Sequence, residues 1–408
     1  MMKKFCLIGE KLPHTLSPVI HSHFGYEYGV EELPSADDIG PFMENCKYDG
    51  FNVTVPYKQD VMKHLDFIDD LAMEIGAVNT VLKKDGKWFG YNSDIYGLEY
   101  SLEKSGISLA GKTIAILGSG GTRMTAQLLA KKQGAKEVVI VSRTGDINYD
   151  NFYKKYDIQV IFNTTPSGMF PHMDELAFDL SLIPNLEGAF DVIYNPLRTN
   201  FLLLAKKCGV KYENGLRMLV EQARVSKDYW FGEKSSKEDT ERILKQLLKS
   251  RRNIVLVGMP ACGKSTIGRK IAQELDLPFF DADVEIEKYC GRKPSEIISS
   301  DGEEAFRKIE SEVISDLASR AGVVIATGGG AVLKEENRTA LLRTGVVFHI
   351  KRDVSKLSTY GRPLSQGTSL ADLLEKRKPF YEDIADHEIA NNGEFSDAAK
   401  KIISILNK

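Results

Sequence analysis

Nine residues, GMPACGKST (258–266), fit the pattern G-x-x-x-x-G-K-[ST] of a loop whose backbone N–H groups surround nucleotide phosphates. An apolar run, NIVLVG, precedes the loop and a helical pattern, STIGRKIAQEL, follows it, which is the context that the motif requires. In such loops the lysine reaches the β- and γ-phosphates and the next hydroxyl faces Mg²⁺. The motif therefore predicts a site for ATP or GTP with Mg²⁺, and its predicted contacts are Gly258, Gly263, Lys264, Ser265 and Thr266.

Three clusters after this loop could bind the molecule that accepts the phosphate. Asp281 and Asp283 follow an apolar run, at the carboxyl end of a predicted strand, where ligands bind in open α/β sheets. Arg307 and Glu310 are three residues apart and would share one face of a helix. The run VVIATGGGAVL contains three consecutive glycines, which let a small ligand approach the backbone. Each cluster taken alone is equally well a solvated turn, a surface ion pair or a loose loop.

A second nucleotide signal lies earlier in the chain. The turn GSGGT (118–122) follows the apolar run KTIAIL and precedes a helical pattern, although Arg123 stands where a third glycine would be. The next predicted strand ends in Ser-Arg-Thr, and a cation there suits a 2′-phosphate, whereas NAD-specific folds carry an acid. We therefore predict NADP, with contacts from Gly118, Ser119, Gly120, Gly121, Ser142, Arg143 and Thr144.

The composition places limits on the class of protein. A chain of 408 residues is too long for one ordinary core, which predicts two or three domains. The net charge of −3 gives no reason to expect nucleic acid or a membrane as a partner. Five scattered cysteines without a C-x-x-C pair indicate reduced thiols, and no apolar run is long enough to span a bilayer. The start, MMKKFCLIG, is typical of a buried strand and not of a signal peptide, so we expect a cytoplasmic protein. The oligomeric state stays open.

Short apolar runs alternate with helical patterns along the chain, which predicts an α/β fold with largely parallel sheets. The predicted strands include 3–9, 50–56, 79–84, 137–143, 160–166 and 188–196. Asp85-Gly86 predicts a hairpin turn after 79–84. Four apolar residues at helical spacing, Ile243, Leu244, Leu247 and Leu248, predict an amphipathic helix before a junction near residue 250. We predict an N-terminal α/β substrate domain (1–100), a Rossmann NADP domain (101–236) and a P-loop kinase domain (251–408), with the helix at about 237–250 packing back on the first.

Considered together and in this order, the motifs of residues 251–408 resemble those of shikimate kinase. The resemblance implies that Asp283 holds the acceptor hydroxyls nearest the base position, that Asp281 supports Mg²⁺, and that Glu310 orients Arg307. The residues implied to contact substrate or the transferring phosphoryl group are Asp283, Arg307, Gly329, Gly330, Arg377 (in EKRKPFYEDIAD) and Arg362 (in GRPLS). This assignment suits a reaction that needs positioning and charge neutralisation.

Two segments of this half depart from the family pattern. KRDVSKLSTYGRPLS is shorter than the usual lid, and Ser358 and Thr359 stand near the position of an additional arginine. ANNGEF replaces the Thr-Asn-Arg found on the adenine side. These departures bear on ATP affinity and turnover more than on the choice of acceptor.

Residues 1–250 resemble shikimate dehydrogenase through seven motifs, HTLSPVIHSHFG, GFNVTVPYKQ, IGAVNTV, GYNSDIYG, NTTPSGM, DVIYNPLRT and ENGLRMLVEQA. The resemblance implies that Lys58 and Asp94 form the polar pair at the reacting oxygen, where a lysine can donate or accept the proton. Alone, the two residues would be an ordinary ion pair. The implied substrate contacts are Thr15, Ser17, Thr54, Lys58, Asn79, Asp94, Tyr194 and Gln222, and the further NADP contacts are Asn163, Gly215 and Met218.

Two departures affect specificity in this half. Thr15 stands where the family usually has serine, which adds a methyl group at the carboxylate end and leaves quinate open as a substrate. No second arginine follows Arg143 near the expected 2′-phosphate, so the preference for NADP over NAD is expected to be modest.

The sequence therefore predicts a bifunctional enzyme. It would reduce 3-dehydroshikimate to shikimate with NADPH and then phosphorylate shikimate with MgATP to shikimate 3-phosphate. Two alternatives stay open: a kinase half that acts on another hydroxy acid such as gluconate, and a quinate/shikimate dehydrogenase whose weakened kinase half serves as a shikimate or nucleotide sensor.

Overall fold

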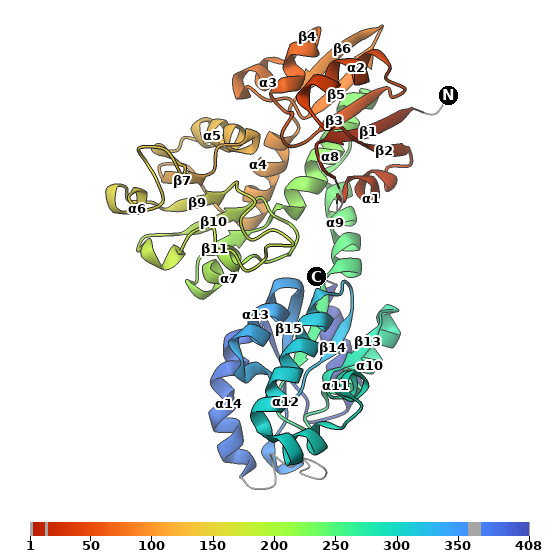
Figure 1. Ribbon diagram of the computed structural model, residues 1–408, viewed down its shortest axis with the longest axis vertical. Coiled ribbons are helices and arrows are strands. Elements are labelled where there is room, and N and C mark those ends of the chain that lie inside the picture. The colour runs from red at the N-terminus through yellow and green to blue at the C-terminus, as the bar shows by residue number, and fades with distance from the viewer. Residues whose placement is uncertain (1–2, 13–14, 358–368, 408) are drawn as a thin grey trace. The chain divides into compact units, whose positions relative to one another are not determined.

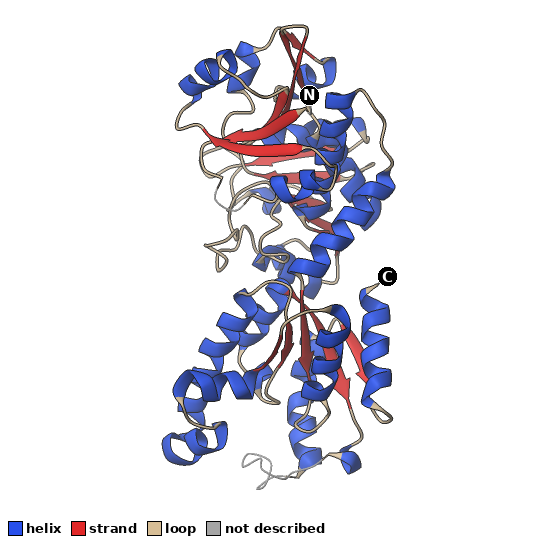
Figure 2. Ribbon diagram, turned by 90° about the vertical axis from the view of Figure 1, so that its right-hand side faces the viewer, coloured by secondary structure: helices blue, strands red, loops and turns tan. Residues whose placement is uncertain are grey.

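The computed structural model describes residues 3–12, 15–357 and 369–407. The chain divides into two compact units, Met1–Gln246 and Leu247–Lys408, and the boundary falls inside helix α9 (Lys237–Arg251). All three sheets are covered by helices (Figures 1 and 2), and two of the three are wholly parallel. The predicted α/β class with largely parallel sheets is therefore confirmed.

The first sheet of unit 1 is mixed, and its strands lie in the order β2-β1-β3-β5-β6-β4. Strand β1 is parallel to its neighbours β2 and β3, whereas β5 is antiparallel to its neighbours β3 and β6. Asp85 and Gly86 form the predicted hairpin turn, both with positive φ (51° and 76°). The strands are β1 (Lys4–Gly9), β2 (Glu27–Glu32), β3 (Gly50–Val53), β4 (Phe67–Ile68), β5 (Thr80–Lys84) and β6 (Lys87–Tyr91).

The second sheet of unit 1 is parallel, in the order β11-β10-β9-β7-β8. Strand β7 pairs with β8 on one side and β9 on the other, so the strand order reverses next to it, which is where open α/β sheets bind ligands. The strands are β7 (Thr113–Leu117), β8 (Glu137–Val141), β9 (Val160–Asn163), β10 (Gly188–Asp191) and β11 (Lys211–Glu213).

Strands β9 and β10 end earlier than the sequence pattern predicts, at Asn163 and Asp191. The side chain of each residue accepts a hydrogen bond from the backbone N–H two positions on, Thr165 N at 3.0 Å and Ile193 N at 3.0 Å. This Asx geometry turns the chain out of the sheet. The residues that the pattern assigned to the strand ends therefore form loops at the carboxyl edge.

Helix α8 connects the two sheets of unit 1. It packs along α4, and its far end reaches the first sheet, where Trp230 Nε1 donates to the Val81 carbonyl at 3.0 Å and the Trp230 ring stacks on Phe5. The helices of this unit are α1 (Ser17–Ser22), α2 (Ile39–Glu44), α3 (Asp70–Ile75), α4 (Asp94–Ser105), α5 (Gly121–Lys132), α6 (Phe152–Lys155), α7 (Asn200–Lys207), α8 (Gly215–Phe231) and the start of α9.

Unit 2 has one parallel sheet, in the order β13-β14-β12-β15-β16, with helices on both faces (Figure 2). On the central strand β12, Val255 and Val257 join one apolar cluster while Ile254 and Leu256 join the other, as expected for a strand buried on both faces. The strands are β12 (Asn253–Val257), β13 (Phe279–Asp281), β14 (Val324–Ala326), β15 (Gly345–Lys351) and β16 (His387–Ala390). The helices are α10 (Lys264–Leu275), α11 (Ala282–Cys290), α12 (Pro294–Ser319), α13 (Glu335–Thr344), α14 (Leu370–Ile384) and α15 (Phe395–Leu406).

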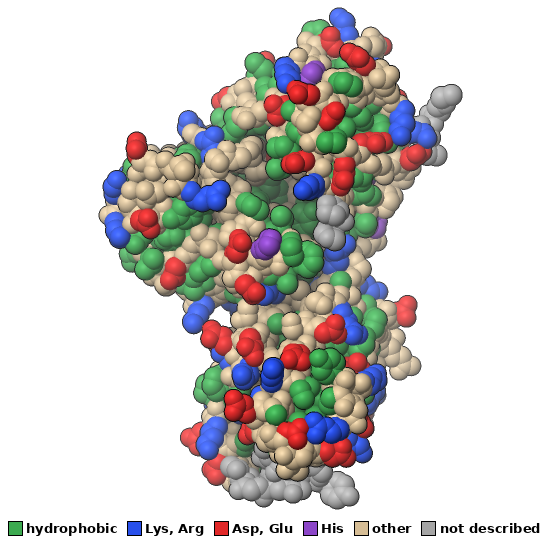
Figure 3. Space-filling model, in the orientation of Figure 1, with side chains coloured by type: hydrophobic (Ala, Val, Ile, Leu, Met, Phe, Trp, Pro, Cys, Tyr) green, Lys and Arg blue, Asp and Glu red, His purple; other side chains and the backbone are tan. Residues whose placement is uncertain are grey.

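On the face shown in Figure 3, acidic and basic side chains are interspersed and neither sign forms a continuous field. Within the described ranges, no helix has both the length and the apolar character needed to cross a membrane.

Candidate active sites

In unit 1, Lys58 and Asp94 form a buried ion pair, with Lys58 Nζ 2.6 Å from Asp94 Oδ2. Lys58 lies in the loop after β3, and Asp94 is the first residue of α4. Asn79 Nδ2 donates to the other carboxylate oxygen, Asp94 Oδ1, at 2.8 Å. The carboxylate is thus fixed at both oxygens, and the Lys58 ammonium has no further partner within the described part of the chain. Its remaining N–H groups are available to a substrate oxygen.

The predicted phosphate turn lies directly beside this pair. Helix α5 begins at Gly121 with Gly120 as its N-cap, and no side chain of the described part of the chain caps its first N–H groups. A Cβ added to Gly121 would lie 3.4 Å from the Lys58 side chain, and one added to Gly118 would lie 2.8 Å from Thr164 Oγ1. An uncapped helix N-terminus with close backbone approach fits a dinucleotide pyrophosphate. The residues present therefore fit NADP.

Thr15 and Ser17, predicted at the substrate carboxylate, follow β1, and Thr54 and Lys58 follow β3, its neighbour in the sheet. Thr15 Oγ1 is 3.2 Å from Ser17 Oγ, and a Cβ on Gly9, the last residue of β1, would lie 2.7 Å from the Thr54 side chain. The end of β1 and the start of the loop that carries Thr54 and Lys58 therefore lie together.

Helix α8 supplies three further predicted residues, Gly215, Met218 and Gln222. Gln222 Oε1 accepts from Ser93 Oγ at 3.3 Å, which places Gln222 beside the Asn79–Asp94 contacts. Gly215 is packed so closely that a Cβ would lie 1.9 Å from the Val192 carbonyl oxygen. Tyr194 follows β10 in the loop that leads to α7.

Ser142, Arg143 and Thr144 follow β8, next to the phosphate turn after β7, and Arg143 and Thr144 are exposed. Asn163 is fully buried, and both ends of its amide bond to protein: Nδ2 donates to Asp191 Oδ1 at 3.1 Å, and Oδ1 accepts from Thr165. The Asn163 side chain thus shapes the loop after β9, whereas its predicted contact with cofactor stays a prediction.

Sequence reasoning missed a buried hydroxyl cluster beneath the Lys58–Asp94 pair. Ser226 Oγ lies 2.8 Å from Thr80 Oγ1 and 3.0 Å from Ser93 Oγ, and it accepts from Asn52 Nδ2 at 2.9 Å. These groups link α8 to Asn52 of β3 and to Thr80, which begins β5 directly after Asn79. The spacing of Ser226, one helical turn after Gln222, was the one available signal.

In unit 2 the nucleotide loop is held by its own lysine. Lys264 Nζ donates to the carbonyls of Gly258 (2.8 Å) and Met259 (2.9 Å). Helix α10 begins at Lys264 after Gly263 (φ 101°), and among the residues that the structure describes no side chain caps it, while Thr266 is exposed in its first turn. An uncapped N-terminus with a lysine beside it fits nucleotide phosphates.

Ser265 and Asp281, the two residues predicted to support Mg²⁺, are in contact. The Ser265 hydroxyl donates to Asp281 Oδ2, and Asp281 Oδ1 accepts from the backbone N–H of Asp283 at 3.1 Å. Asp281 ends β13 and caps α11, so this geometry is set at the carboxyl edge of the sheet. A hydroxyl and a carboxylate are the oxygen ligands that Mg²⁺ prefers.

The three glycines after β14 lie against the side chains of Asp283, Arg307 and Glu310, which are predicted at the site of the molecule that accepts the phosphate. A Cβ on Gly328 would lie 2.9 Å from Glu310 Oε1 and 3.2 Å from Asp283 Oδ1. A Cβ on Gly330 would lie 2.3 Å from the Arg307 guanidinium, and one on Gly329 would meet Pro260 of the nucleotide loop at 2.6 Å. Only glycine allows these approaches, because any side chain would displace a charged group or the loop.

Arg307 and Glu310 form a buried ion pair at this site. Arg307 Nη1 donates to Glu310 Oε2 at 2.6 Å, as the i,i+3 spacing predicts, and Arg307 also contacts the exposed Glu303 at 2.9 Å. Burial raises the pKa of the Glu310 carboxyl, and Arg307 and Arg377 oppose that rise. Both arginines therefore act on the same carboxylate. Beside Arg307, a cavity of about 400 Å³ is lined by Glu303, Glu304, Arg307, Leu333 and Lys334.

Three further contacts in unit 2 were not predicted. Tyr381, one turn after Arg377, donates to the Gly329 carbonyl at 2.5 Å. In the ANNGEF segment, Asn391 Nδ2 donates to the Cys262 carbonyl at 2.7 Å, and the Phe395 ring packs on Gly263. The ANNGEF segment, which differs from the family pattern, therefore packs against the nucleotide loop. The predictions for Arg362, Ser358 and Thr359 lie outside the described residues.

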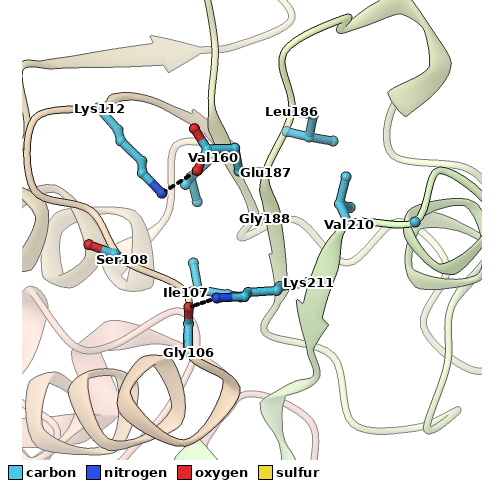
Figure 4. A pocket seen from close by; sticks show the side chains of 11 residues that line it. Gly106, Ile107, Ser108, Lys112, Val160, Leu186, Glu187, Gly188, Val210 and Lys211 are labelled. Atoms are coloured by element: carbon cyan, nitrogen blue, oxygen red, sulfur yellow. Dashed lines mark hydrogen bonds and ion pairs between the residues drawn. The ribbon is translucent and has the colours of Figure 1, made fainter.

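A separate cavity of about 340 Å³ lies at the amino ends of β7, β9, β10 and β11 (Figure 4). In it, Lys112 pairs with Glu187 at 2.7 Å and Lys211 Nζ donates to the Gly106 carbonyl at 2.7 Å. No predicted site residue lines this cavity. It opens at the opposite edge of the sheet from the phosphate turn.

Comparison with known proteins agrees with this geometry. The family model of the shikimate dehydrogenase substrate binding domain matches residues 7–81, and that of shikimate kinase matches residues 260–407. A shikimate dehydrogenase (NADP(+)) of Clostridium perfringens is 37% identical over 267 residues, which cover 60% of this chain and 98% of the relative.

Two solved structures are similar to the same part of the chain. Shikimate dehydrogenase 1 of Peptoclostridium difficile has 34% identity and a TM-score of 0.57, covering 60% of this chain and 98% of its own. The Thermus thermophilus enzyme in complex with NADP(H) and shikimate has 28% identity and a TM-score of 0.53, covering 60% and 99%. The chain therefore belongs to the shikimate dehydrogenase family and carries a shikimate kinase domain at its C-terminal end.

Proposed function

We propose that this protein catalyses two successive steps of the shikimate pathway. Unit 1 reduces 3-dehydroshikimate to shikimate with NADPH, and unit 2 phosphorylates shikimate to shikimate 3-phosphate with MgATP. The observation that carries the first step is the buried Lys58–Asp94 pair beside the uncapped N-terminus of α5. The meeting of Asp283, Glu310 and Arg307 at the three glycines supports the second step.

In the first reaction, bound NADPH supplies the hydride. The Lys58 ammonium donates a proton to the ketone oxygen as negative charge develops there. Asp94 and Asn79 hold Lys58 in place, because both carboxylate oxygens are already bonded. In the reverse direction Lys58 accepts the proton. Thr15 and Ser17 offer hydroxyls to the substrate carboxylate.

In the second reaction, bound MgATP supplies the phosphoryl group. Arg307 and Arg377 bind the shikimate carboxylate, for which the arginine fork is suited. Asp283 accepts the hydrogen bond of the attacking hydroxyl at the edge of the three glycines. When nucleotide binds, Lys264 exchanges its two carbonyl partners for phosphate oxygens.

The first experiment combines the purified chain with 3-dehydroshikimate, NADPH and MgATP and identifies the products by mass spectrometry. Shikimate 3-phosphate is the expected product. Accumulation of shikimate alone would reject the kinase step and favour the sensor alternative. Lys58→Ala should abolish NADPH oxidation while leaving phosphorylation of added shikimate intact, so the two units serve as controls for each other.

The cofactor preference has its own test. Arg143→Ala should raise the KM for NADPH far more than the KM for NADH, because only NADPH carries the 2′-phosphate. An equal effect on both would reject this role for Arg143. Comparing shikimate with quinate as substrates tests the consequence of Thr15.

A further inference from the structure

One fully buried carboxylate in unit 1 has no part in the reactions above. Asp191, the last residue of β10, accepts hydrogen bonds from three segments: from Asn163 Nδ2 (3.1 Å) and Ile193 N (3.0 Å) on Oδ1, and from Thr199 Oγ1 (2.6 Å) on Oδ2. Asn163 and Thr199 are also fully buried. A single carboxylate therefore joins the end of β9, the loop after β10 and the start of α7.

The first of these segments leads to the phosphate turn. With Nδ2 held by Asp191, Asn163 Oδ1 accepts from Thr165 N and Oγ1, which fixes the turn of the loop 163–169. The adjoining Thr164 donates to the Leu117 carbonyl at 2.7 Å and packs on Gly118. The orientation of Asn163 thus sets how this loop packs on the turn after β7.

The other two segments close the same loop from the opposite side. Thr199 caps α7 and packs on Gly168, where a Cβ would lie 3.3 Å from the threonine side chain. The Phe170 N–H donates to the Asn195 carbonyl at 3.0 Å, and the Ile193 carbonyl accepts from the N–H of Gly215, the first residue of α8. The loops 163–169 and 192–198 and the start of α8 therefore form one body.

We propose that Asp191 is a positioning residue for the hydride-transfer reaction, because its carboxylate sets the two loops and the start of α8 against which the cofactor lies. The inference rests on the proposed dehydrogenase function. Asp191 itself does not touch cofactor or substrate, since its side-chain oxygens are occupied by Asn163, Ile193 and Thr199.

The test uses two variants that preserve volume. Asp191→Asn keeps the shape but turns an acceptor into a donor toward Thr199, and Thr199→Val replaces the hydroxyl by a methyl group, which also removes the cap bond from Leu202 N at 3.4 Å. Assays at about pH 8 lie above the pKa of about 7 to which burial raises this carboxyl. The full-length protein is used, and NADPH affinity is measured both by equilibrium fluorescence titration and as KM.

Both variants should weaken NADPH binding by about tenfold, because a small displacement of the loops that contact the cofactor lowers its affinity strongly. The KM for 3-dehydroshikimate should stay near the wild-type value, and Thr199→Ser, which keeps the hydroxyl, should restore NADPH affinity. Ser101→Ala, which removes another buried hydroxyl bond (Ser101 Oγ to the Gly97 carbonyl), is the matched control and should leave affinity unchanged.

Equal changes in both KM values, or a lower melting temperature with unchanged NADPH affinity, would overturn the positioning role. If Thr199→Ser binds NADPH as weakly as Thr199→Val, the hydroxyl bond is not the cause and the inference also fails. A wild-type protein that neither binds nor oxidises NADPH would instead reject the proposed dehydrogenase function.

Discussion

Replacement of Glu310 by glutamine tests whether the buried ion pair of unit 2 both stabilises the unit and orients Arg307. The Glu310 side chain is 1% exposed and that of Arg307 is 8% exposed, at a distance of 2.6 Å. Removing one charge of a buried pair costs about 3–5 kcal/mol, because the other charge stays buried without its partner. Glu303 still contacts Arg307 but is 51% exposed, so its contact offsets only a small part of this loss of stability. We expect Glu310→Gln to lower the free energy of unfolding by about 3 kcal/mol.

The measurement is urea unfolding of the full-length protein, with and without ATP. ATP stabilises only the unit that binds it, which identifies the transition of unit 2. The kinase assay should show the KM for shikimate raised by about 10- to 100-fold, because Arg307 loses the group that orients it. The kcat measured at saturating shikimate should change less than this KM.

Glu303→Gln is the matched control, since it removes a carboxylate from the same arginine. Because that carboxylate is exposed, we expect a loss below about 1 kcal/mol and little change in KM. If the two variants have equal effects, burial is not what gives the Glu310 contact its strength. A loss below about 1 kcal/mol for Glu310→Gln would also contradict the reasoning.

Three further predictions concern backbone geometry and proton linkage. Gly215→Ala should abolish NADPH oxidation but not shikimate phosphorylation, because its Cβ would lie 1.9 Å from the Val192 carbonyl oxygen; retained oxidation would show that α8 shifts without cost. Ala261 has a left-handed φ of 64°, so Ala261→Gly should stabilise unit 2 by about 0.5 kcal/mol in urea unfolding after the entropy of glycine is counted. The helical control Ala272→Gly should destabilise it by about 1 kcal/mol, and similar losses in both would refute the strain at Ala261. Burial raises the pKa of Asp191 from its ordinary value to about 7, so the native state binds a proton that the unfolded chain releases, and stability is greatest below the ordinary value. Unit 1 should therefore lose up to about 4 kcal/mol as the pH rises from about 4 to about 7, with little further change above that, and Asp191→Asn should remove this slope; parallel pH profiles for the two proteins would contradict it.

Elements whose signals are local could be predicted from the sequence. The loop at 258–266, the turn at 118–122 and the Asp85-Gly86 hairpin each depend on residues adjacent in the chain, and the structure forms all three where expected. The alternation of apolar runs and helical patterns predicted the α/β class for the same reason. The motif order carried the resemblance to both families, which the comparisons confirm.

The tertiary structure supplies the physical reason why residues far apart in the chain meet. Lys58 and Asp94 are 36 residues apart, and they form a pair only because the loop after β3 and the start of α4 lie at the same edge of the first sheet. The ends of β9 and β10 were predicted too late because a side chain that bonds the backbone two residues on leaves no trace in apolar periodicity. Asp191, Ser226 and Tyr381 escaped prediction because their partners come from other elements. Their roles arise from directional hydrogen bonds between distant segments, which periodicity and spacing along one element do not encode.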